Sequence, residues 1–344
     1  MPIYLQIGLA VVAALVVSLA ATPLVKWFAN RIGAIDVPKD SRRVHKSPIP
    51  RLGGLAIFIG FMLSVLLLAD ITLQVRGILI GAVLIVIIGV IDDMIRLPAL
   101  IKLIVQIIAA LVAVWHGVVI DTFSNPIVFS ASRYIILRSF SIPVTVIWIV
   151  AITNSVNLID GLDGLAVGVS TISSIAMLII SLMVSEINDA LIMAALTGAC
   201  LGFMPYNFNP AKIFMGDTGA LLLGYILATM SILGLFKFYA VVSFAAPFLV
   251  LALPLFDTSF AFFRRLLKGK NPMSPDRGHF HHRLLDMGLS QKQAVLVLYT
   301  ISGILGIAAV VVATSDKIRA LILVIALLIA TVIVYFVYRG TRTK

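Results

Sequence analysis

Long runs of aliphatic residues alternate along this chain with short polar stretches. Eleven of these runs come close to or reach the length of about 17–25 residues that a helix needs to cross a bilayer. They cover residues 3–25, 52–69, 74–91, 98–118, 141–158, 164–184, 189–205, 218–236, 239–257, 293–313 and 318–338. The pattern predicts an all-α integral membrane protein with about eleven transmembrane helices, in which residues 1–344 form a single transmembrane domain.

The composition agrees with a membrane protein. Hydrophobic residues make up 61% of the chain and charged residues only 12%, whereas about 25% of the residues of a soluble domain are charged. The single cysteine, Cys200, lies in an apolar run, which excludes a disulfide and a cysteine-based metal site. The first run lacks a small-residue cleavage site, so it is expected to remain as a span. In the loop at 119–140, β-branched and polar residues at 127–137 predict a small hairpin.

An odd number of spans places the two termini on opposite faces of the membrane. When the loops are assigned to the two faces in alternation, 20 of the 26 Lys and Arg residues fall on one face. The positive-inside rule makes this face cytoplasmic, with the N-terminus outside and the C-terminus in the cytoplasm. Basic cytoplasmic loops then account for the net charge of +11, and no nucleic-acid partner is expected.

Acidic residues gather on the same face: ten of the fifteen acids lie there, and all ten are aspartates. The stretch "GVIDDMIRL" ends the third span with Asp92 and Asp93. Adjacent side chains point about 100° apart on a helix, so the two are expected to have different roles. Two solvated interfacial acids are the simpler alternative. On the next span, Lys102 and Gln106 form a polar stripe at i, i+4 spacing.

A second polar motif, "TNSVNLIDGLDGL", ends the fifth span. Asn154, Asn157 and Asp160 are three residues apart, which places them along one side of a helix, and Asp163 follows the first Asp-Gly. Asp-Gly is also a common turn dipeptide. A turn alone, however, does not require two intramembrane asparagines before it.

The third motif precedes the eighth span and reads "YNFNPAKIFMGDTGALLLGY". Asp217 there is expected to cap the helix that follows, because Asp is a preferred N-cap residue and helix N-termini favour negative charge. Capping is compatible with metal binding. Phe214 is either an interfacial aromatic or a platform on which a nucleotide base stacks, and Asn207 adds an amide nearby.

The fourth motif, "PDRGHFHHRLLDMGLS", contains the His cluster: His279, His281, His282 and Arg283. Its spacing lacks the i, i+4 histidine pair typical of helical zinc sites. Three imidazoles and a guanidinium instead suit a diphosphate, which they would bind through charge-assisted hydrogen bonds. A solvated basic loop is the alternative. Near the second span, "VHKSPIPRLGGL" adds Lys46 and Arg51, although basic residues are expected on this face in any case.

Aspartates for a divalent cation beside basic groups for phosphates favour phosphoryl transfer, in which catalysis is mostly positioning and charge neutralisation. Oxygen ligands without cysteine favour Mg²⁺, with Mn²⁺ as a substitute. The competing hypothesis is a secondary transporter of a sugar nucleotide or a lipid-linked sugar. Transporters place their acids near the midplane and often have repeated halves, whereas these acids lie at helix ends and no repeat is visible.

At these motifs the chain resembles the polyprenyl-phosphate N-acetylhexosamine-1-phosphate transferases, the superfamily of MraY, WecA and TagO. The resemblance covers nearly the whole chain. The matching motifs are Asp92-Asp93, Asn154-x-x-Asn157-x-x-Asp160-Gly-x-Asp163-Gly, Phe214-x-Gly-Asp217-x-Gly and His279-Phe-His281-His282-Arg283. In the form of the last motif and in its eleven predicted spans, the chain resembles members of the WecA/TagO branch.

The resemblance implies an enzyme of the bacterial plasma (inner) membrane with its active site on the cytoplasmic face. The donor would be UDP-GlcNAc, the acceptor undecaprenyl phosphate and the metal Mg²⁺; a homodimer is left open. Asp217 would be the chief metal ligand with Asn157 as the second, although Asp160 or Asp163 could take that place. The implied catalytic residues are Asp92, Asp93, Asp160, His279, His281 and His282. The implied substrate-binding residues are Lys46, Asn154, Asp163, Asn207, Phe214 and Arg283.

Overall fold

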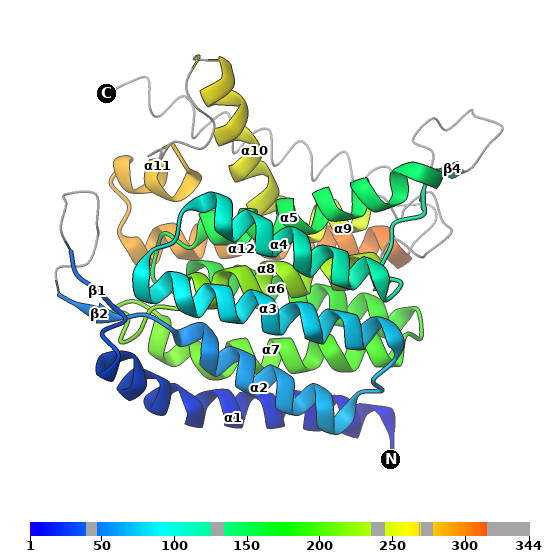
Figure 1. Ribbon diagram of the computed structural model, residues 1–344, viewed down its shortest axis with the longest axis horizontal. Helices are drawn as coiled ribbons and strands as arrows, with labels where there is room; N and C mark the ends of the chain where they lie inside the picture. The colour runs from blue at the N-terminus through cyan, green and yellow to red at the C-terminus, as the bar shows by residue number, and fades with distance from the viewer. Residues whose placement is uncertain (39–46, 125–133, 235–244, 268, 270–277, 315–344) are drawn as a thin grey trace.

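The computed structural model describes residues 1–38, 47–124, 134–234, 245–267, 269 and 278–314. Nine of the predicted runs each form one helix, and these helices pack into a bundle (Figure 1). They are α1 (Ile3–Arg31), α2 (Gly53–Leu68), α3 (Leu73–Ile95), α4 (Ala99–Trp115), α5 (Ser141–Ile159), α6 (Leu165–Met183), α7 (Ile187–Asn207), α8 (Gly216–Gly234) and α12 (Gln291–Thr314).

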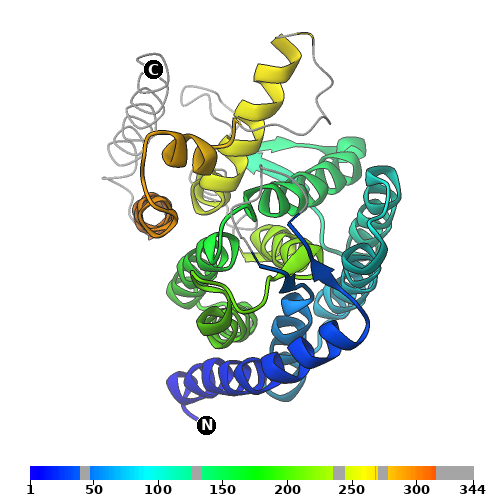
Figure 2. The same cartoon turned by 90° about the vertical axis from the view of Figure 1, so that its left-hand side faces the viewer.

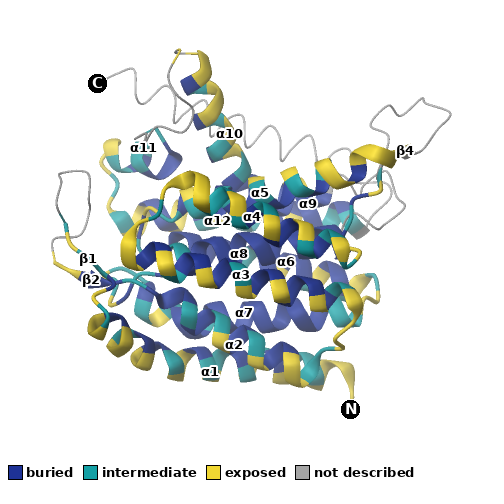
Figure 3. Ribbon diagram, in the orientation of Figure 1, coloured by how far each residue is buried: buried dark blue, intermediate teal, exposed yellow. Residues whose placement is uncertain are grey.

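Among the described residues, seven helices are long and apolar enough to cross a membrane. The other two, α2 and α4, are apolar but shorter. Many large apolar side chains on the outside of the bundle are exposed, as expected where lipid replaces water (Figure 3). The all-α polytopic class is therefore confirmed. The count of eleven and the sidedness of the termini stay predictions, and the run 318–338 lies outside the described residues.

The ninth predicted run, 239–257, differs from the prediction in its described part. It is divided between α9 (Ala245–Val250) and α10 (Ala252–Leu267), and α10 projects from the bundle (Figure 1). Pro254 has no backbone N–H and therefore cannot donate to the carbonyl of Val250, as a continuous helix would require. The hydroxyl of Ser173 donates to that carbonyl instead, at 2.9 Å. The break is thus built into the sequence and stabilised by α6.

The core of the bundle is α8, which α2, α3, α5 and α6 surround (Figure 2). Almost all of α8 is buried. Its first turn is approached closely by α2, where Gly54 lies against the backbone of Gly219 and leaves no room for a Cβ atom. Small residues allow this close approach of helices in membranes. The N-terminal end of α8, which carries Asp217, is consequently held at a fixed place in the bundle.

Two small antiparallel sheets complete the fold. β3 (Thr122–Ser124) pairs with β4 (Tyr134–Ile136), followed by the 3-10 helix η1 (Arg138–Phe140). β4 lies within the predicted hairpin stretch 127–137, but its partner β3 precedes that stretch, and the predicted turn lies outside the described residues. The second sheet pairs β1 (Ile35–Asp36) with β2 (Ile49–Pro50) and was not predicted from the sequence.

Candidate active site

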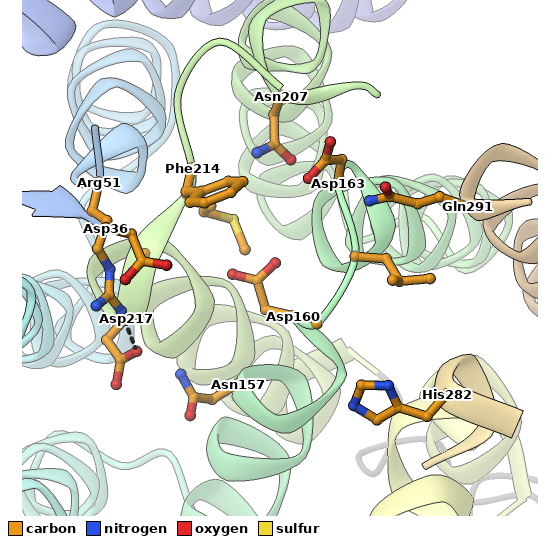
Figure 4. Close-up of a pocket in the computed structure, with 14 residues that line it drawn as sticks. Asp36, Arg51, Asn157, Asp160, Asp163, Asn207, Phe214, Asp217, His282 and Gln291 are labelled. Carbon is orange, nitrogen blue, oxygen red and sulfur yellow. Dashed lines mark ion pairs between the residues drawn. The ribbon is translucent and has the colours of Figure 1, made fainter. Parts of the chain in front are cut away.

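A pocket of about 370 Å³ lies where the acidic and amide motifs meet (Figure 4). Its walls come from segments far apart in the sequence. The polar and aromatic residues that line it are Asp36, Arg51, Asn157, Asp160, Asp163, Asn207, Phe214, Asp217, His282 and Gln291. Seven of these ten were predicted as site residues from the sequence, so the structure brings half of the fourteen predicted site residues to one cavity.

Asp217 stands in the first turn of α8 between two cations. Lys102 Nζ lies 2.7 Å from Asp217 Oδ2 and 3.1 Å from Asp92 Oδ2. Arg51 Nη2 lies 3.6 Å from Asp217 Oδ1. The two cations offset the repulsion between neighbouring carboxylates close to hydrocarbon. Lys102 was visible in the sequence as part of a polar stripe, but nothing in that stripe indicated Asp217 as its partner.

Asp93 has a different role from its neighbour Asp92. Its carboxylate accepts the backbone N–H of Asp217 at 3.0 Å, and the N–H and hydroxyl of Thr218 at 3.1 and 2.7 Å. The two N–H groups belong to the first turn of α8, where backbone N–H groups have no acceptor within the helix. Asp93 therefore caps α8 from α3, and Arg51 Nε lies 3.2 Å from the same carboxylate. Gly216, with φ of 72°, packs so closely on Asp93 that a Cβ atom would clash.

Asp92 instead accepts the backbone N–H of Leu97 at 2.6 Å and faces Lys102. The two adjacent aspartates thus have different partners, and their roles in the reaction stay predictions. Neither of them lines the pocket. Asp92 reaches Asp217 through Lys102, whereas Asp93 fixes the backbone on which Asp217 stands.

The acid turn (residues 160–164) follows α5 and forms one wall of the pocket. Burial and the negative charge of Asp217 raise the pKa of Asp160 to about 7. Asp163 Oδ2 accepts hydrogen bonds from Asn209 Nδ2 at 2.9 Å and from the N–H of Ala211 at 3.0 Å. Asp163 thus ties the acid turn to the loop that leads to Phe214, while still lining the pocket.

Two of the predicted asparagines also hold the structure together. Asn207 accepts the N–H of Gly164 and donates to the carbonyl of Ile213, both at 3.1 Å. Asn154 donates to Gln106 Oε1 at 2.5 Å, which joins α5 to α4, and it does not line the pocket. Their substrate-binding roles stay predictions. Lys46 lies outside the described residues.

Phe214 is held by backbone contacts with β2 and the start of α2. Its N–H donates to the carbonyl of Pro50 at 2.8 Å, and its carbonyl accepts the N–H of Gly53 at 2.9 Å. The segment around Phe214 therefore runs beside β2, which also brings Arg51 and Asp36 to the pocket (Figure 4). Asp36 and Gln291 were not predicted as site residues, and no motif in the sequence distinguishes them.

The His cluster lies at the start of α11 (Phe280–Asp286). His282 lines the pocket, and the ring of His281 packs on Gly161 of the acid turn, where a Cβ atom would clash. Burial and the neighbouring His282 lower the pKa of His281 to about 3, so its ring is neutral at physiological pH. His279, His281 and Arg283 do not line the pocket.

The donor set fits a hard divalent cation. Asp217, Asn157 and Asp160 line one cavity (Figure 4) and offer only oxygen among their metal-binding atoms. Mg²⁺ is bound through one or two carboxylates together with waters and substrate phosphates, rather than by a complete protein cage. Within the described ranges, no group of three or more His, Cys, Asp or Glu side chains is arranged to hold a metal.

Comparison with known proteins supports the same class of enzyme. The family model described as glycosyl transferase family 4 matches residues 75–235. The chain is 41% identical, over 94% of its length and 90% of the relative, to a Bacillus subtilis protein named "Probable undecaprenyl-phosphate N-acetylglucosaminyl 1-phosphate transferase". It is 36% identical to a decaprenyl-phosphate N-acetylglucosaminephosphotransferase of Mycolicibacterium smegmatis, over 95% and 87% of the two chains.

A third relative, an undecaprenyl-phosphate alpha-N-acetylglucosaminyl 1-phosphate transferase of Thermotoga maritima, is 31% identical over 83% of this chain and 84% of its own. The similarity to the first two relatives extends over nearly the full chain, and the family match at residues 75–235 spans the segments that carry Asn157 and Asp217. The chain therefore belongs to glycosyl transferase family 4, within the superfamily of polyprenyl-phosphate N-acetylhexosamine-1-phosphate transferases.

Proposed function

We propose that this protein transfers N-acetylglucosamine 1-phosphate from UDP-GlcNAc to undecaprenyl phosphate, giving undecaprenyl-diphospho-GlcNAc and UMP. The observation that carries the proposal is that Asp217, Phe214 and His282 line one pocket. A nucleotide sugar requires these three kinds of group: a carboxylate to bind a metal, an aromatic ring to stack on the base and an imidazole to bind phosphate. The names of the relatives support the GlcNAc donor and the polyprenyl acceptor.

The nucleotide would occupy the side of the pocket formed by Phe214 and the acid turn. Phe214 stacks on the uracil ring, which gains about 1–3 kcal/mol per stacked base in other nucleotide-binding proteins. Asn207 and Asp163 hold the surrounding loops in place and present their remaining polar surface to the nucleotide. Lys46 would add a cation at the same end. The diphosphate lies between Asp217 and His282, with the rest of the His cluster behind it.

Mg²⁺, when bound, would neutralise the diphosphate charge, with Asp217 as its chief protein ligand and Asn157 as the second; Mn²⁺ is expected to substitute. In the reaction, an oxygen of the lipid phosphate attacks the β-phosphorus of UDP-GlcNAc. The bond from that phosphorus to the bridging oxygen breaks, and UMP leaves with this oxygen. Asp92, held by Lys102, would orient the lipid phosphate or accept its proton.

Direct attack is the proposed route. The alternative is a two-step route through an aspartyl phosphate on Asp92 or Asp93. The structure makes Asp93 a poor nucleophile, because both of its oxygens accept hydrogen bonds that cap α8. The side-chain exposure of Asp93 is 0%, so a phosphoryl group would have no room there without displacement of α8.

The membrane setting follows from the chemistry. The phosphate of a polyprenyl lipid lies at the membrane–water interface, so the acids that act on it must lie there too. We place this interface on the cytoplasmic side of the bacterial plasma membrane, where the nucleotide sugar is available. The product would begin a lipid-linked surface polysaccharide such as teichoic acid or O-antigen.

The test is UMP release by the purified protein supplied with undecaprenyl phosphate, Mg²⁺ and a panel of UDP-sugars. We expect UMP from UDP-GlcNAc only when the lipid phosphate is present. A transporter of sugar nucleotides would release no UMP from any donor. Product from UDP-MurNAc-pentapeptide but not from UDP-GlcNAc would contradict the proposed donor while leaving the transferase chemistry intact.

A further inference from the structure

We propose that Asp257 on α10 is a positioning residue of this transferase site and acts through His279; the inference rests on the proposed function. Both side chains are buried, with 3% and 5% exposure. Asp257 Oδ2 lies 2.9 Å from His279 Nδ1, and Asp257 Oδ1 accepts the backbone N–H of Phe280 at 2.8 Å. One carboxylate thus holds both the imidazole and the first residue of α11.

The contact determines which nitrogen of His279 carries a proton. An ionised carboxylate can only accept hydrogen bonds, so Nδ1 of His279 must be the donor. In the neutral ring Nε2 is then the unprotonated nitrogen. In other enzymes, too, a carboxylate behind a histidine sets the tautomer and the orientation of the ring. Asp257 has no counterpart among the motifs recognised in the sequence.

Other contacts between the two helices surround this pair. Arg264 Nη1 of α10 donates to the carbonyl of Gly278 at 2.8 Å. The ring of Phe260 stacks on that of Phe280 with centroids 6.4 Å apart, and the guanidinium of Arg283 lies 5.1 Å from the Phe260 centroid. These contacts do not involve Asp257. They are expected to keep α11 docked on α10 when Asp257 is replaced, so that its loss affects the His279 ring first.

A line of rings connects His279 with the pocket. The rings of His279 and His281 are stacked at 5.7 Å, within 8° of parallel, and those of His281 and His282 are 4.3 Å apart. His281 packs on Gly161, and His282 lines the pocket across from Asp160 (Figure 4). A rotation of the His279 ring would therefore shift the two imidazoles that meet the acid turn. This path links Asp257 to the reaction without contact with substrate.

The test compares Asp257→Asn with wild type in full-length protein, in nanodiscs. Asparagine can still accept the Phe280 N–H, but it presents an N–H₂ group to Nδ1 and so favours the other tautomer. We expect kcat to fall about 10- to 100-fold, the loss seen when orienting partners of metal-bound histidines are removed, while KM for UDP-GlcNAc changes less than about threefold. Thr258→Val is the matched control: this neighbour on α10 has a buried hydroxyl without a hydrogen-bond partner in the described structure, and wild-type activity is expected.

Two further readouts separate positioning from general damage. In ¹⁵N spectra of histidine-labelled protein, assigned with His279→Ala, wild type should show a protonated Nδ1 on His279, and Asp257→Asn should lose this signature. Combining Asp257→Asn with His279→Ala should reduce kcat no further than His279→Ala alone. The effects of two substitutions are not additive when one residue acts through the other. Asp257→Glu, which retains the carboxylate, should recover part of the activity.

Three results would overturn the proposal. They are multiplicative losses of kcat in the double variant, an unprotonated Nδ1 on His279 in wild type, and a wild-type kcat in Asp257→Asn. If Asp257→Asn does not fold, the wild-type spectrum and the activity of Asp257→Glu decide the question. An unprotonated Nδ1 on His279 in wild type then contradicts the proposal. Failure of the proposed function has a different signature. Wild type would then release no UMP with any donor, while the spectrum of His279 would still report its tautomer.

Discussion

Lys102 lies 2.7 Å from Asp217, the carboxylate proposed to bind the metal. The ion pair joins α4 to the first turn of α8, and the same ammonium group contacts Asp92. A divalent cation that binds Asp217 must compete with Lys102 for the negative charge of this site. The relationship makes the affinity for the metal sensitive to a side chain that is not a ligand.

Lys102→Met should therefore increase the affinity of the substrate-free protein for Mn²⁺. A unit charge about 4 Å away contributes at most about 4 kcal/mol at an effective dielectric constant near 20, so a gain of roughly fivefold or more is expected. Mn²⁺ titration followed by electron paramagnetic resonance measures it. Arg76→Met removes one positive charge at the opposite end of α3 and should leave the affinity unchanged. Equal affinities of Lys102→Met and wild type would show that Lys102 does not compete with the metal.

Asp217→Asn should abolish turnover but leave the fold intact. Asparagine is also an accepted residue at helix N-termini, whereas it lacks the charge that a divalent cation requires. We expect UMP release to fall about 1000-fold or more, comparable to the loss of a principal electrostatic group in an active site. The variant should still insert and fold, with a cooperative thermal unfolding transition. Activity retained at saturating Mg²⁺ would remove Asp217 from the metal site.

Asp93→Ala should lower stability rather than only activity. The substitution leaves the N–H groups of Asp217 and Thr218 without their acceptor and removes the carboxylate that lies 3.2 Å from Arg51 Nε. Removal of one partner of a buried ion pair costs about 3–5 kcal/mol. Unfolding in mixed micelles of increasing denaturing detergent measures the change. Asp70→Ala, an exposed aspartate at the other end of the bundle, serves as the control and should be nearly neutral.

The stability of the metal-free protein should depend on pH through Asp160. Because the pKa of Asp160 is raised to about 7 in the folded state, the folded protein binds more protons than the unfolded chain between about pH 4 and 7. Stability is therefore lost as the pH rises through this window, and protonated Asp160 is the favoured form below it.

Asp160→Asn, which cannot ionise, should become progressively more stable than wild type from pH 5 to pH 8. Thermal unfolding in the presence of EDTA, followed over this range, measures the difference. Glu186→Gln removes an exposed carboxylate outside the pocket and should give a difference from wild type that is constant over the same range. A constant difference for Asp160→Asn as well would mean that Asp160 titrates normally.

Much of the fold and part of the site could be predicted from local sequence. Hydrophobic run lengths predicted nine helices, and the helical spacing of Asn157 and Asp160 predicted that both would face one cleft. Partners distant in sequence could not be predicted in this way. Asp93 caps a helix 124 residues further along the chain, and only the packing of α3 against α8 brings the two together. Arg51 gave no signal, because basic residues are common in cytoplasmic loops.

The break between α9 and α10 was missed for a related reason. The run 239–257 is mostly apolar, and hydropathy does not register that Pro254 removes one helical hydrogen bond. The acceptor that Pro254 leaves without a helical donor is satisfied by Ser173, a contact between segments far apart in the chain. Asp257 was counted among the cytoplasmic acids but could not be assigned, since its partner lies beyond a loop whose path the sequence does not reveal.

This break has a consequence for inhibition. Asp217 is fixed by the centre of the bundle, whereas the His cluster is attached to α10, which packs on α5 at its start and projects from the bundle at its end. An inhibitor that contacts both Asp217 and His282 must bridge two separately supported parts of the molecule. Its residence time will then depend on how firmly α10 holds α11, and resistance can arise by substitutions on α10 that the compound never touches.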